Sequence, residues 1–247
     1  MKDLTDTKVF FINLPSRADR RAKFERQEAL SYMPPTTRVE GVQGSTLNVR
    51  KDKRIGLNTR VQVLTEYRRS HYEIHSPGAI GASLSHLKAW KAFLKSGAQF
   101  GLILEDDAEL PVAFAQMVKD CAKDLPESWD IWILGWNHSP KDKTEKTGDV
   151  TPFREVLQFA GAHCYILKRA AAEALVKEAL PVETHVEYFM NNTALIHGMR
   201  IVRHLDLCIK QMDRIKNKSD VRKVVGCPVC VVDDKGEAIR AREANSA

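Results

Sequence analysis

The stretch Phe100–Leu110 reads FGLILEDDAEL, an apolar run that ends in three consecutive carboxylates. Its first five residues predict a short buried strand of the kind found in a parallel sheet covered on both faces. Glu105, Asp106 and Asp107 follow where the strand should leave the sheet, and in open α/β folds this carboxyl edge binds ligands. Because strand side chains alternate in direction, we expect Glu105 and Asp107 to point together and Asp106 to point away. Such a pair suits a hard divalent cation that carries a diphosphate, although a solvated acidic turn before Pro111 is the alternative.

The segment before this strand, His75–Lys95, has the apolar spacing of an amphipathic helix over its residues 80–95. Gly78 and Gly81 allow a close backbone approach where the helix begins, and Ser85 and His86 lie in its first turns. A helix start carries free backbone N–H groups and a partial positive charge, so it suits a phosphate group.

Strand and helix patterns alternate along the rest of the chain. Further strands are expected at Val9–Asn13, Thr37–Val42, Asp130–Leu134, in two pieces of Val156–Leu167, and at Arg200–Ile209. Further helices are expected at Arg17–Leu30, Pro111–Lys123, Arg169–Leu180 and Thr184–Asn192. The charged stretch Asn48–Ile74 lacks a sustained period and predicts an insertion or loop, as does the polar stretch Ser139–Asp149. The alternation predicts an α/β fold with a mostly parallel sheet flanked by helices, a single domain over residues 1–209. The charged residues 210–247 would then be either a lid over the site or a disordered tail.

Composition narrows the function class. The chain has 247 residues and 43% hydrophobic content, enough for a core, and no apolar stretch approaches the roughly 20 residues that cross a membrane. The N-terminus lacks the apolar region of a secretory signal, so we expect a cytoplasmic protein that is soluble or peripheral to a membrane. The net charge of +6 gathers in basic runs, which are solvated faces or sites for anionic partners such as a nucleotide-sugar or lipid headgroups. Aromatic residues make up only 7% and fall mostly inside apolar runs, which argues against nucleic acid.

The five cysteines form no regular framework. Cys121 and Cys164 sit in apolar periodic segments and are expected in the core. Cys227 and Cys230 have the spacing of half a zinc site or a redox pair, but no matching second half exists.

Three ordered blocks of the sequence carry a family resemblance: FFINLPSRADRR (10–21), GAIGASLSHLKAW (78–90) and LILEDDA (102–108). Together they resemble glycosyltransferase family 25, which includes bacterial lipooligosaccharide and collagen galactosyltransferases, and weaker similarity extends to about Pro181. The resemblance implies a GT-A-like fold and a metal-dependent, inverting transfer of a hexose, galactose by default, from a UDP-sugar to a hydroxyl of a glycan acceptor.

The resemblance also implies roles for single residues. An acidic DxD-type motif would hold Mn²⁺ (or Mg²⁺) against the diphosphate, with Asp107 favoured as ligand, then Asp106 and Glu105, and His204 as a further candidate. The departure from a strict DxD leaves open which carboxylate binds the metal directly.

Candidate residues for the donor and for the base come partly from this resemblance and partly from the residue pattern itself. Asn13, Arg17 and Arg21 would lie at the nucleotide, together with Ser85, His86, Glu105 and Asp106; the alternative for the arginines is a solvated basic helix. An acidic residue after a proline matches Glu183 as the general base that inversion requires. Glu187, four residues on and on the same helix face, is the second candidate, and both glutamates could equally be ordinary surface residues.

Two tryptophans have different predicted positions, and two other functions are compatible with the sequence. Trp132 is expected in the core, whereas Trp136 at a strand end is the better candidate to stack on a sugar. A nucleotidyltransferase or phosphatase could use the same carboxylates, and a catalytically inert basic interaction module could keep the same fold.

Overall fold

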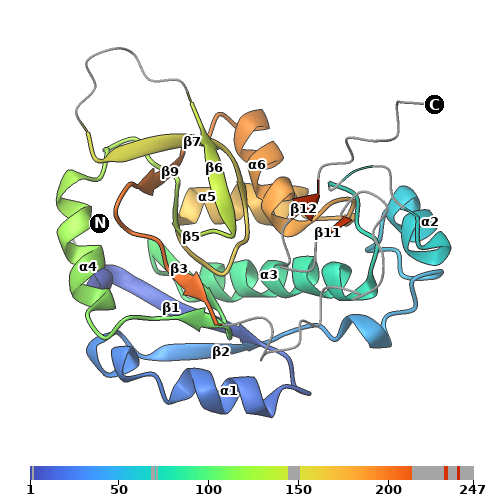
Figure 1. Cartoon of the computed structure of the whole chain (residues 1–247), viewed down its shortest axis with the longest axis horizontal. Coiled ribbons are helices and arrows are strands. Elements are labelled where there is room, and N and C mark those ends of the chain that lie inside the picture. The colour runs from blue at the N-terminus through green and yellow to red at the C-terminus, as the bar shows by residue number, and fades with distance from the viewer. Residues whose placement is uncertain are drawn as a thin grey trace.

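The computed structural model describes residues 1, 3–67, 70, 72–143, 151–212, 231–232 and 238–239. Its centre is an eight-stranded sheet with the order β2-β1-β3-β8-β5-β9-β7-β6 (Figure 1). The strands are β1 (Thr7–Asn13), β2 (Thr36–Glu40), β3 (Phe100–Glu105), β5 (Ile131–Gly135), β6 (His138–Asp142), β7 (Phe153–Ala160), β8 (Cys164–Lys168) and β9 (Ile201–His204). Two small ribbons join β4 (Ala108–Glu109) to β10 (Lys210–Gln211), and β11 (Val231–Val232) to β12 (Ala238–Ile239).

Most strands of the sheet share one direction. β1 runs parallel to β2 and β3, and β5 runs parallel to β9, whereas β8 and β7 each run antiparallel to both of their neighbours. Six of the eight strands therefore point the same way, and β8 and β7 are the exceptions. The expected α/β fold with a mostly parallel sheet flanked by helices is confirmed.

Helices cover both faces of the sheet (Figure 1). They are α1 (Ala18–Glu25), α2 (Leu57–Thr65), α3 (Pro77–Lys95), α4 (Phe114–Cys121), α5 (Arg169–Glu178) and α6 (Val186–Ile196). On β3, Ile103 faces a core shared with α3, α5 and α6, while Leu102 and Leu104 face a core shared with α1 and α4. This alternation at full burial is what the apolar run before Glu105 predicts. Among the described helices none is both long and apolar enough to span a bilayer.

Several expected elements differ from the structure. The stretch Asn48–Ile74 is not a plain loop: it contains α2, and Ile55 just before α2 forms a β-bridge with Val182. The first helix ends at Glu25 and is followed by a 3-10 turn, and the helix expected from Pro111 begins only at Phe114. Part of the polar stretch 139–149 forms β6, because it finds a partner in β7.

The tryptophan and cysteine side chains that were expected in the core are not all buried. Trp132 and Cys164 are fully buried, as expected, whereas Cys121 is only half-buried. Cys227 and Cys230, and most of the tail 210–247, lie outside the described residues.

Candidate active site

The acidic triplet lies at the carboxyl end of β3. Glu105 is the last residue of the strand, and Asp106 and Asp107 form the turn into β4. The amide Nε2 of Gln211 on β10 lies 3.4 Å from Oε2 of Glu105 and 3.3 Å from Oδ1 of Asp107. The backbone N–H of Met212 donates to the carbonyl of Asp107 at 2.7 Å, which fixes β10 beside the turn. Glu105 and Asp107 therefore converge on one point, the amide of Gln211, although Asp107 lies in the turn and not in the strand.

Asp106 contacts β1 and α1. Its Oδ2 accepts a 2.7 Å hydrogen bond from Nδ2 of Asn13, the last residue of β1. Its Oδ1 pairs with the guanidinium of Arg20 at 2.9 Å, and Arg20 also pairs with Oδ2 of Asp107. Oδ1 of Asn13 accepts from Nε of Arg38 at 3.0 Å, so the Asn13 amide is fixed on both sides. Asn13 and Arg20 thus both lie beside the acidic triplet.

Arg20 is the arginine of α1 that reaches the carboxylates. Arg17 instead pairs with Asp19 at 2.9 Å, and Arg21 pairs with Glu25 across one helical turn at 2.8 Å. The sequence contains a signal for Arg20, because it lies four residues before Phe24, which is fully buried against the sheet. Residues one helical turn apart share a face, so Arg20 points toward the sheet edge.

Glu105 is held by a buried chain of polar groups. Nε2 of His86 on α3 lies 3.2 Å from Oε1 of Glu105, and Nδ1 of His86 lies 2.9 Å from the hydroxyl of Tyr165. The indole N–H of Trp90 donates to the same hydroxyl at 2.8 Å. Because a carboxylate only accepts, Nε2–H of His86 donates to Glu105; this assignment is inferred from the network. His86 therefore lies beside the acidic triplet and orients one of its carboxylates.

The three carboxylates differ in their pKa values. Burial works against ionisation of Glu105, but the hydrogen bond and charge of His86 outweigh it and hold the Glu105 pKa below its usual value. Burial raises the pKa of Asp106 to about 6, although Arg20 and Asn13 act in the opposite direction. Burial and then the negative charge of Glu105 raise the pKa of Asp107. Such raised values indicate a cluster that a further positive charge would stabilise.

Glu187 approaches the cluster from α6. It lies in the first turn of that helix and is half-buried. Burial, followed by the negative charge of Glu105, raises the Glu187 pKa. Gly161 has a φ of +92°, which favours glycine, and its Cα packs against Asn137. The structure thus brings Glu187 into the electrostatic field of Glu105.

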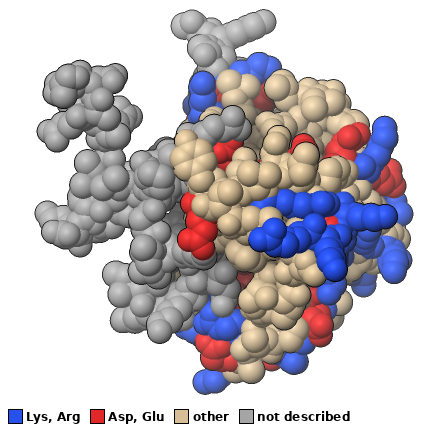
Figure 2. All heavy atoms as spheres, turned by 90° about the vertical axis from the view of Figure 1, so that its right-hand side faces the viewer, with Lys and Arg blue, Asp and Glu red and all other residues tan. Residues whose placement is uncertain are grey.

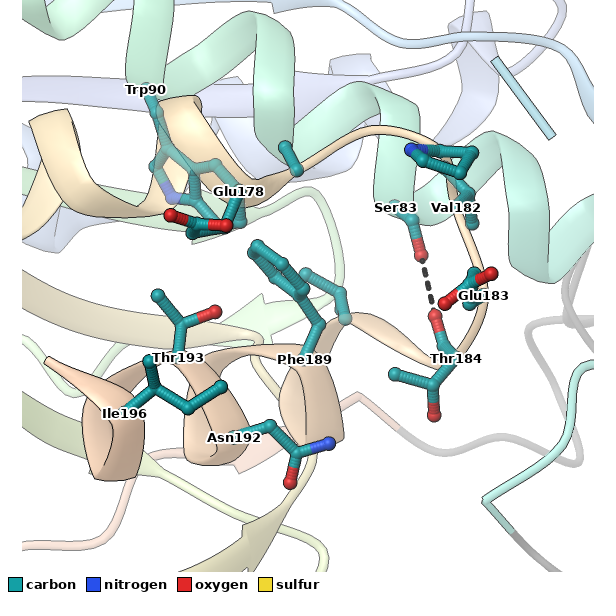
Figure 3. Close-up of a pocket in the computed structure, with 13 residues that line it drawn as sticks. Ser83, Trp90, Glu178, Val182, Glu183, Thr184, Phe189, Asn192, Thr193 and Ile196 are labelled. Carbon is teal, nitrogen blue, oxygen red and sulfur yellow. Dashed lines mark hydrogen bonds between the residues drawn. The ribbon is translucent and has the colours of Figure 1, made fainter. Parts of the chain in front are cut away.

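Glu183 lies at the edge of a separate pocket. Its side chain is exposed and packs against Gly56, where an added Cβ would come 2.7 Å from Cγ of Glu183. The pocket has a volume of about 210 Å³ and contains both acidic and aromatic side chains. Figure 3 shows the ring of Phe189 at its centre, with Glu178 on one side and Glu183 on the other. The pocket residues are Ser83, Trp90, Glu178, Ala179, Pro181, Val182, Glu183, Thr184, Val186, Phe189, Asn192, Thr193 and Ile196.

The start of α3 does not present an open phosphate site. The hydroxyl of Ser76 caps the helix by accepting from the backbone N–H of Ala79 at 3.2 Å. A Cβ added at Gly81 would come 2.5 Å from the carbonyl of Val42, so the close approach is made by the chain's own backbone. Ser85 is buried and accepts from the backbone N–H of Val42 at 2.8 Å. Ser85 and this helix start both pack the 42–44 segment, and their contact with the donor stays a prediction.

His204 is not brought to the carboxylates. Its Nδ1 accepts from the backbone N–H of Asp206 at 3.1 Å, and its ring packs edge-on against Phe153. Glu105 and His204 end strands that are separated in the sheet by β8 and β5. The expected metal role of His204 has no support in this geometry. Trp136 is half-buried with the guanidinium of Arg203 over its ring at 5.5 Å, so a cation already occupies that indole face.

The arrangement of the carboxylates determines whether they can coordinate a divalent cation. Among the described residues, no group of three or more His, Cys, Asp or Glu is arranged to hold a metal ion. A Mg²⁺ or Mn²⁺ ion that carries phosphates, however, commonly takes only one or two carboxylates and completes its shell with water and phosphate oxygens. Oε2 of Glu105 and Oδ1 of Asp107 converge on the Gln211 amide, and hard oxygens with a raised Asp107 pKa suit such an ion. The pair fits a cation in that mode.

Comparison with known proteins identifies relatives of this sequence. The sequence pattern described as "Glycosyltransferase family 25 (LPS biosynthesis protein)" matches residues 6–190. Procollagen galactosyltransferase 1 of Danio rerio is 26% identical over 146 residues, which cover 56% of this chain and 23% of that protein. Procollagen galactosyltransferase 1-A of Xenopus laevis is 28% identical over 145 residues, covering 56% and 22%. The chain therefore spans less than a quarter of the length of these relatives.

Solved structures resemble the chain only distantly. UDP-glucose pyrophosphorylase in complex with UDP-glucose aligns over 83% of this chain and 92% of that one, with a TM-score of 0.43 and 11% identity. A197 from STIV aligns over 84% and 94%, with a TM-score of 0.42 and 14% identity. Likeness at this level supports no functional inference.

Proposed function

This chain belongs to glycosyltransferase family 25. We propose that it transfers a hexose, with galactose as the default sugar, from a UDP-sugar to a hydroxyl of a glycan acceptor. The galactosyltransferase names of its relatives support the choice of sugar. The matched region contains β3 with its acidic end, α1 and α3, which are the elements that build the carboxylate cluster.

The observation that carries the proposal is the convergence of Glu105 and Asp107 on one point at the carboxyl edge of the sheet. A bound Mn²⁺ or Mg²⁺ would supply a Lewis acid that neutralises the leaving diphosphate. Glu105 and Asp107 would hold it there, and Gln211 would give way. His86 fixes the orientation of Glu105, while Asn13 and Arg20 fix Asp106, so the carboxylates need little rearrangement when the donor binds.

For the proton of the acceptor hydroxyl we propose Glu187 as general base. Its raised pKa gives its carboxylate more basicity than that of an exposed glutamate, and its position near Glu105 puts it close to the proposed donor site. Glu183, which the family resemblance favours, is exposed and lines the pocket around Phe189. That pocket, with its aromatic floor and polar rim, suits a sugar ring of the acceptor, and Glu183 would then contact acceptor hydroxyls.

The proposal is tested by incubating the purified chain with UDP-galactose, UDP-glucose and UDP-N-acetylglucosamine, each with Mn²⁺ and with EDTA. We expect release of UDP from UDP-galactose that is lost in EDTA. Release of pyrophosphate or of free phosphate would instead identify a nucleotidyltransferase or a phosphatase. If UDP titrated by calorimetry in Mn²⁺ gives no heat, the chain is an inert module on this fold.

A further inference from the structure

Helix α2 has its polarity reversed relative to an ordinary surface helix. Such helices bury an apolar stripe and expose a polar face. On α2 the apolar stripe is outside: Leu57, Val61 and Leu64 follow the i, i+4, i+7 spacing of one face and are 72%, 52% and 42% exposed. A stripe that faces solvent at this length and spacing calls for a ligand or partner of its own.

The side of α2 that faces the protein is the more polar one. Thr59 is fully buried and Gln62 nearly so, and together with Val63 they form the inward face of the helix. Neither the Thr59 hydroxyl nor the Gln62 carbonyl oxygen finds a hydrogen-bond partner among the described residues. Burial of these polar side chains without hydrogen bonds lowers the stability of the fold, while the apolar side chains of the helix remain exposed.

Basic residues precede this helix in the sequence. Residues 50–66 contain five Lys or Arg against two Asp or Glu. Arg50, Lys51 and Lys53 are exposed, while Arg54 pairs with Asp52 at 2.6 Å and so neutralises one of the two acids. Figure 2 shows the side of the molecule on which α2 lies in Figure 1, and Lys and Arg side chains gather there in one broad cluster. We call Leu57, Val61 and Leu64 with these three basic residues the α2 face.

We propose that the α2 face docks the protein onto an anionic lipid surface. A short helix with exposed apolar side chains and neighbouring cations inserts its apolar stripe at the headgroup level, and the cations bind anionic lipid. A protein partner fits less well, because a stable interface uses about 20 residues on each side and α2 offers three apolar ones. The charge of the α2 face is complementary to acidic headgroups, which decides between the two occupants.

The α2 face lies next to the pocket around Phe189. The backbone N–H of Gly56, which precedes Leu57, donates to the carbonyl of Val182 at 2.9 Å, and Gly56 packs against Glu183 of the pocket edge. Docking through α2 would therefore hold this pocket near the membrane. The lipid binding itself does not depend on the proposed sugar transfer and is measured without any donor.

Co-sedimentation of the full chain with vesicles tests the proposal. We expect binding to vesicles of phosphatidylcholine with one third phosphatidylglycerol, and little binding to pure phosphatidylcholine. Leu57→Ser should weaken binding about tenfold, since an inserted leucine is lost. The matched control is Leu195→Ser, which removes a leucine that is 81% exposed at the end of α6 and outside the α2 face; it should leave binding unchanged.

The charge contribution has its own matched pair. Lys51→Glu with Lys53→Glu should weaken binding to the mixed vesicles more than tenfold and reduce its salt dependence, because each cation near the surface contributes about fivefold. Lys91→Glu with Lys95→Glu on α3 makes the same change in net charge elsewhere and should act weakly.

Three results would overturn the proposal. The first is absence of binding to the mixed vesicles. The second is an equal loss in both leucine variants or in both charge variants, because binding would then be non-specific. The third is a dimer, seen by light scattering without lipid, that Leu57→Ser dissociates; the α2 face would then be an interface between two copies.

Discussion

At the scale of single residues, the site is governed by the opposition between burial and charge. Among the described residues Asp106 pairs with one cation, Arg20, which it shares with Asp107. Burial raises the Asp106 pKa to about 6 in spite of that partner. An aspartate that resists ionisation inside a folded protein makes the stability of that protein depend on pH in a definite direction.

The first prediction follows from the sign of that shift. The Asp106 pKa is about 6 in the folded state against the ordinary value of 3.8, so the folded state binds the proton more tightly. The group therefore favours folding fully below about pH 3.8 and loses this contribution as pH rises through about 6. From pH 4.5 to 7.5, urea unfolding should show the wild type losing about 2 kcal/mol relative to Asp106→Asn.

The control for this pH profile is Asp120→Asn. Asp120 is an exposed residue of α4 whose pKa is lowered by hydrogen bonds from Lys123 and Gln116, so it has no such effect in this pH range. If the difference between wild type and Asp106→Asn stays constant from pH 4.5 to 7.5, Asp106 is fully ionised throughout and our account of its burial is wrong.

The second prediction separates the two glutamates near α6. Glu187→Gln should slow transfer to a real acceptor by about 10²- to 10⁴-fold with little change in UDP binding, since a general base acts only on the acceptor proton. Glu183→Gln should chiefly raise the KM for acceptor, because we assign Glu183 to the acceptor pocket. Steady-state kinetics with varied acceptor measures both, and the reverse pattern would assign the base to Glu183.

At the scale of elements, two neighbouring arginines of α1 lie on different faces of the helix and make different ion pairs. Arg20 and Arg21 are adjacent, but Arg20 reaches two buried carboxylates while Arg21 makes an exposed pair within the helix. The run of basic residues after β1 predicted a basic helix but not which arginine faces the sheet. Only the position of Phe24, four residues after Arg20, specifies the inward face.

The third prediction uses this adjacent pair. Arg20→Ala should lower the free energy of unfolding at pH 7 by about 3 kcal/mol, because it leaves buried carboxylates without their cation. Arg21→Ala should lower it by no more than about 0.5 kcal/mol, as for an exposed pair on one helix. Denaturant unfolding at pH 7 measures the difference. At pH 4.5 the effect of Arg20→Ala should shrink, since Asp106 is then largely protonated, and an undiminished effect would contradict this electrostatic account.

Helix α2 is an element that sequence reasoning missed. Its apolar residues 57, 61 and 64 follow a helical period, but the period is short and lies in a strongly charged stretch. Its position depends on the bridge between Ile55 and Val182, two residues far apart in the sequence. A contact of that range leaves no local signal in the sequence, so neither the helix nor its reversed polarity could be read from composition.

The fourth prediction concerns the buried side of α2. Thr59→Val should raise the free energy of unfolding by about 1 kcal/mol, because it replaces a buried hydroxyl that has no partner among the described residues by a methyl group of similar shape. Thr65→Val in the last turn of α2 is the control, since that threonine is exposed, and it should change stability by less than about 0.5 kcal/mol. Destabilisation by Thr59→Val would mean that its hydroxyl is satisfied.

At the scale of the whole molecule, the sheet was predictable and the site only in part. Buried strands such as β3 are marked by apolar runs, so the α/β class and the acidic edge followed from local pattern. The sequence did not indicate that β8 runs antiparallel to β3, because the direction of a strand depends on the path of the connections before and after it. Gln211 reaches the carboxylates from a separate part of the chain, and it is no more marked in sequence than any other glutamine.

The site is formed by segments that are far apart in the sequence. Within the described chain it joins the end of β1, helix α1, the end of β3 and strand β10, segments that run from Asn13 to Gln211. A ligand that binds only this junction should stabilise the folded state as a whole, by an amount set by its concentration relative to its dissociation constant.

The fifth prediction measures that linkage. UDP at about 100 times its dissociation constant, with Mn²⁺, should add about 2.7 kcal/mol to the free energy of unfolding and raise Tm by about 5–10 °C. In EDTA the same UDP should raise Tm far less, because the diphosphate then meets uncompensated carboxylates. Asp107→Asn should remove the Mn²⁺-dependent part and slow transfer by about 10²- to 10³-fold, whereas Asp124→Asn, an exposed control, should behave as wild type. An equal shift by UDP with and without Mn²⁺ would mean that side chains such as Arg20 hold the diphosphate alone, and the metal assignment to Glu105 and Asp107 would then be wrong.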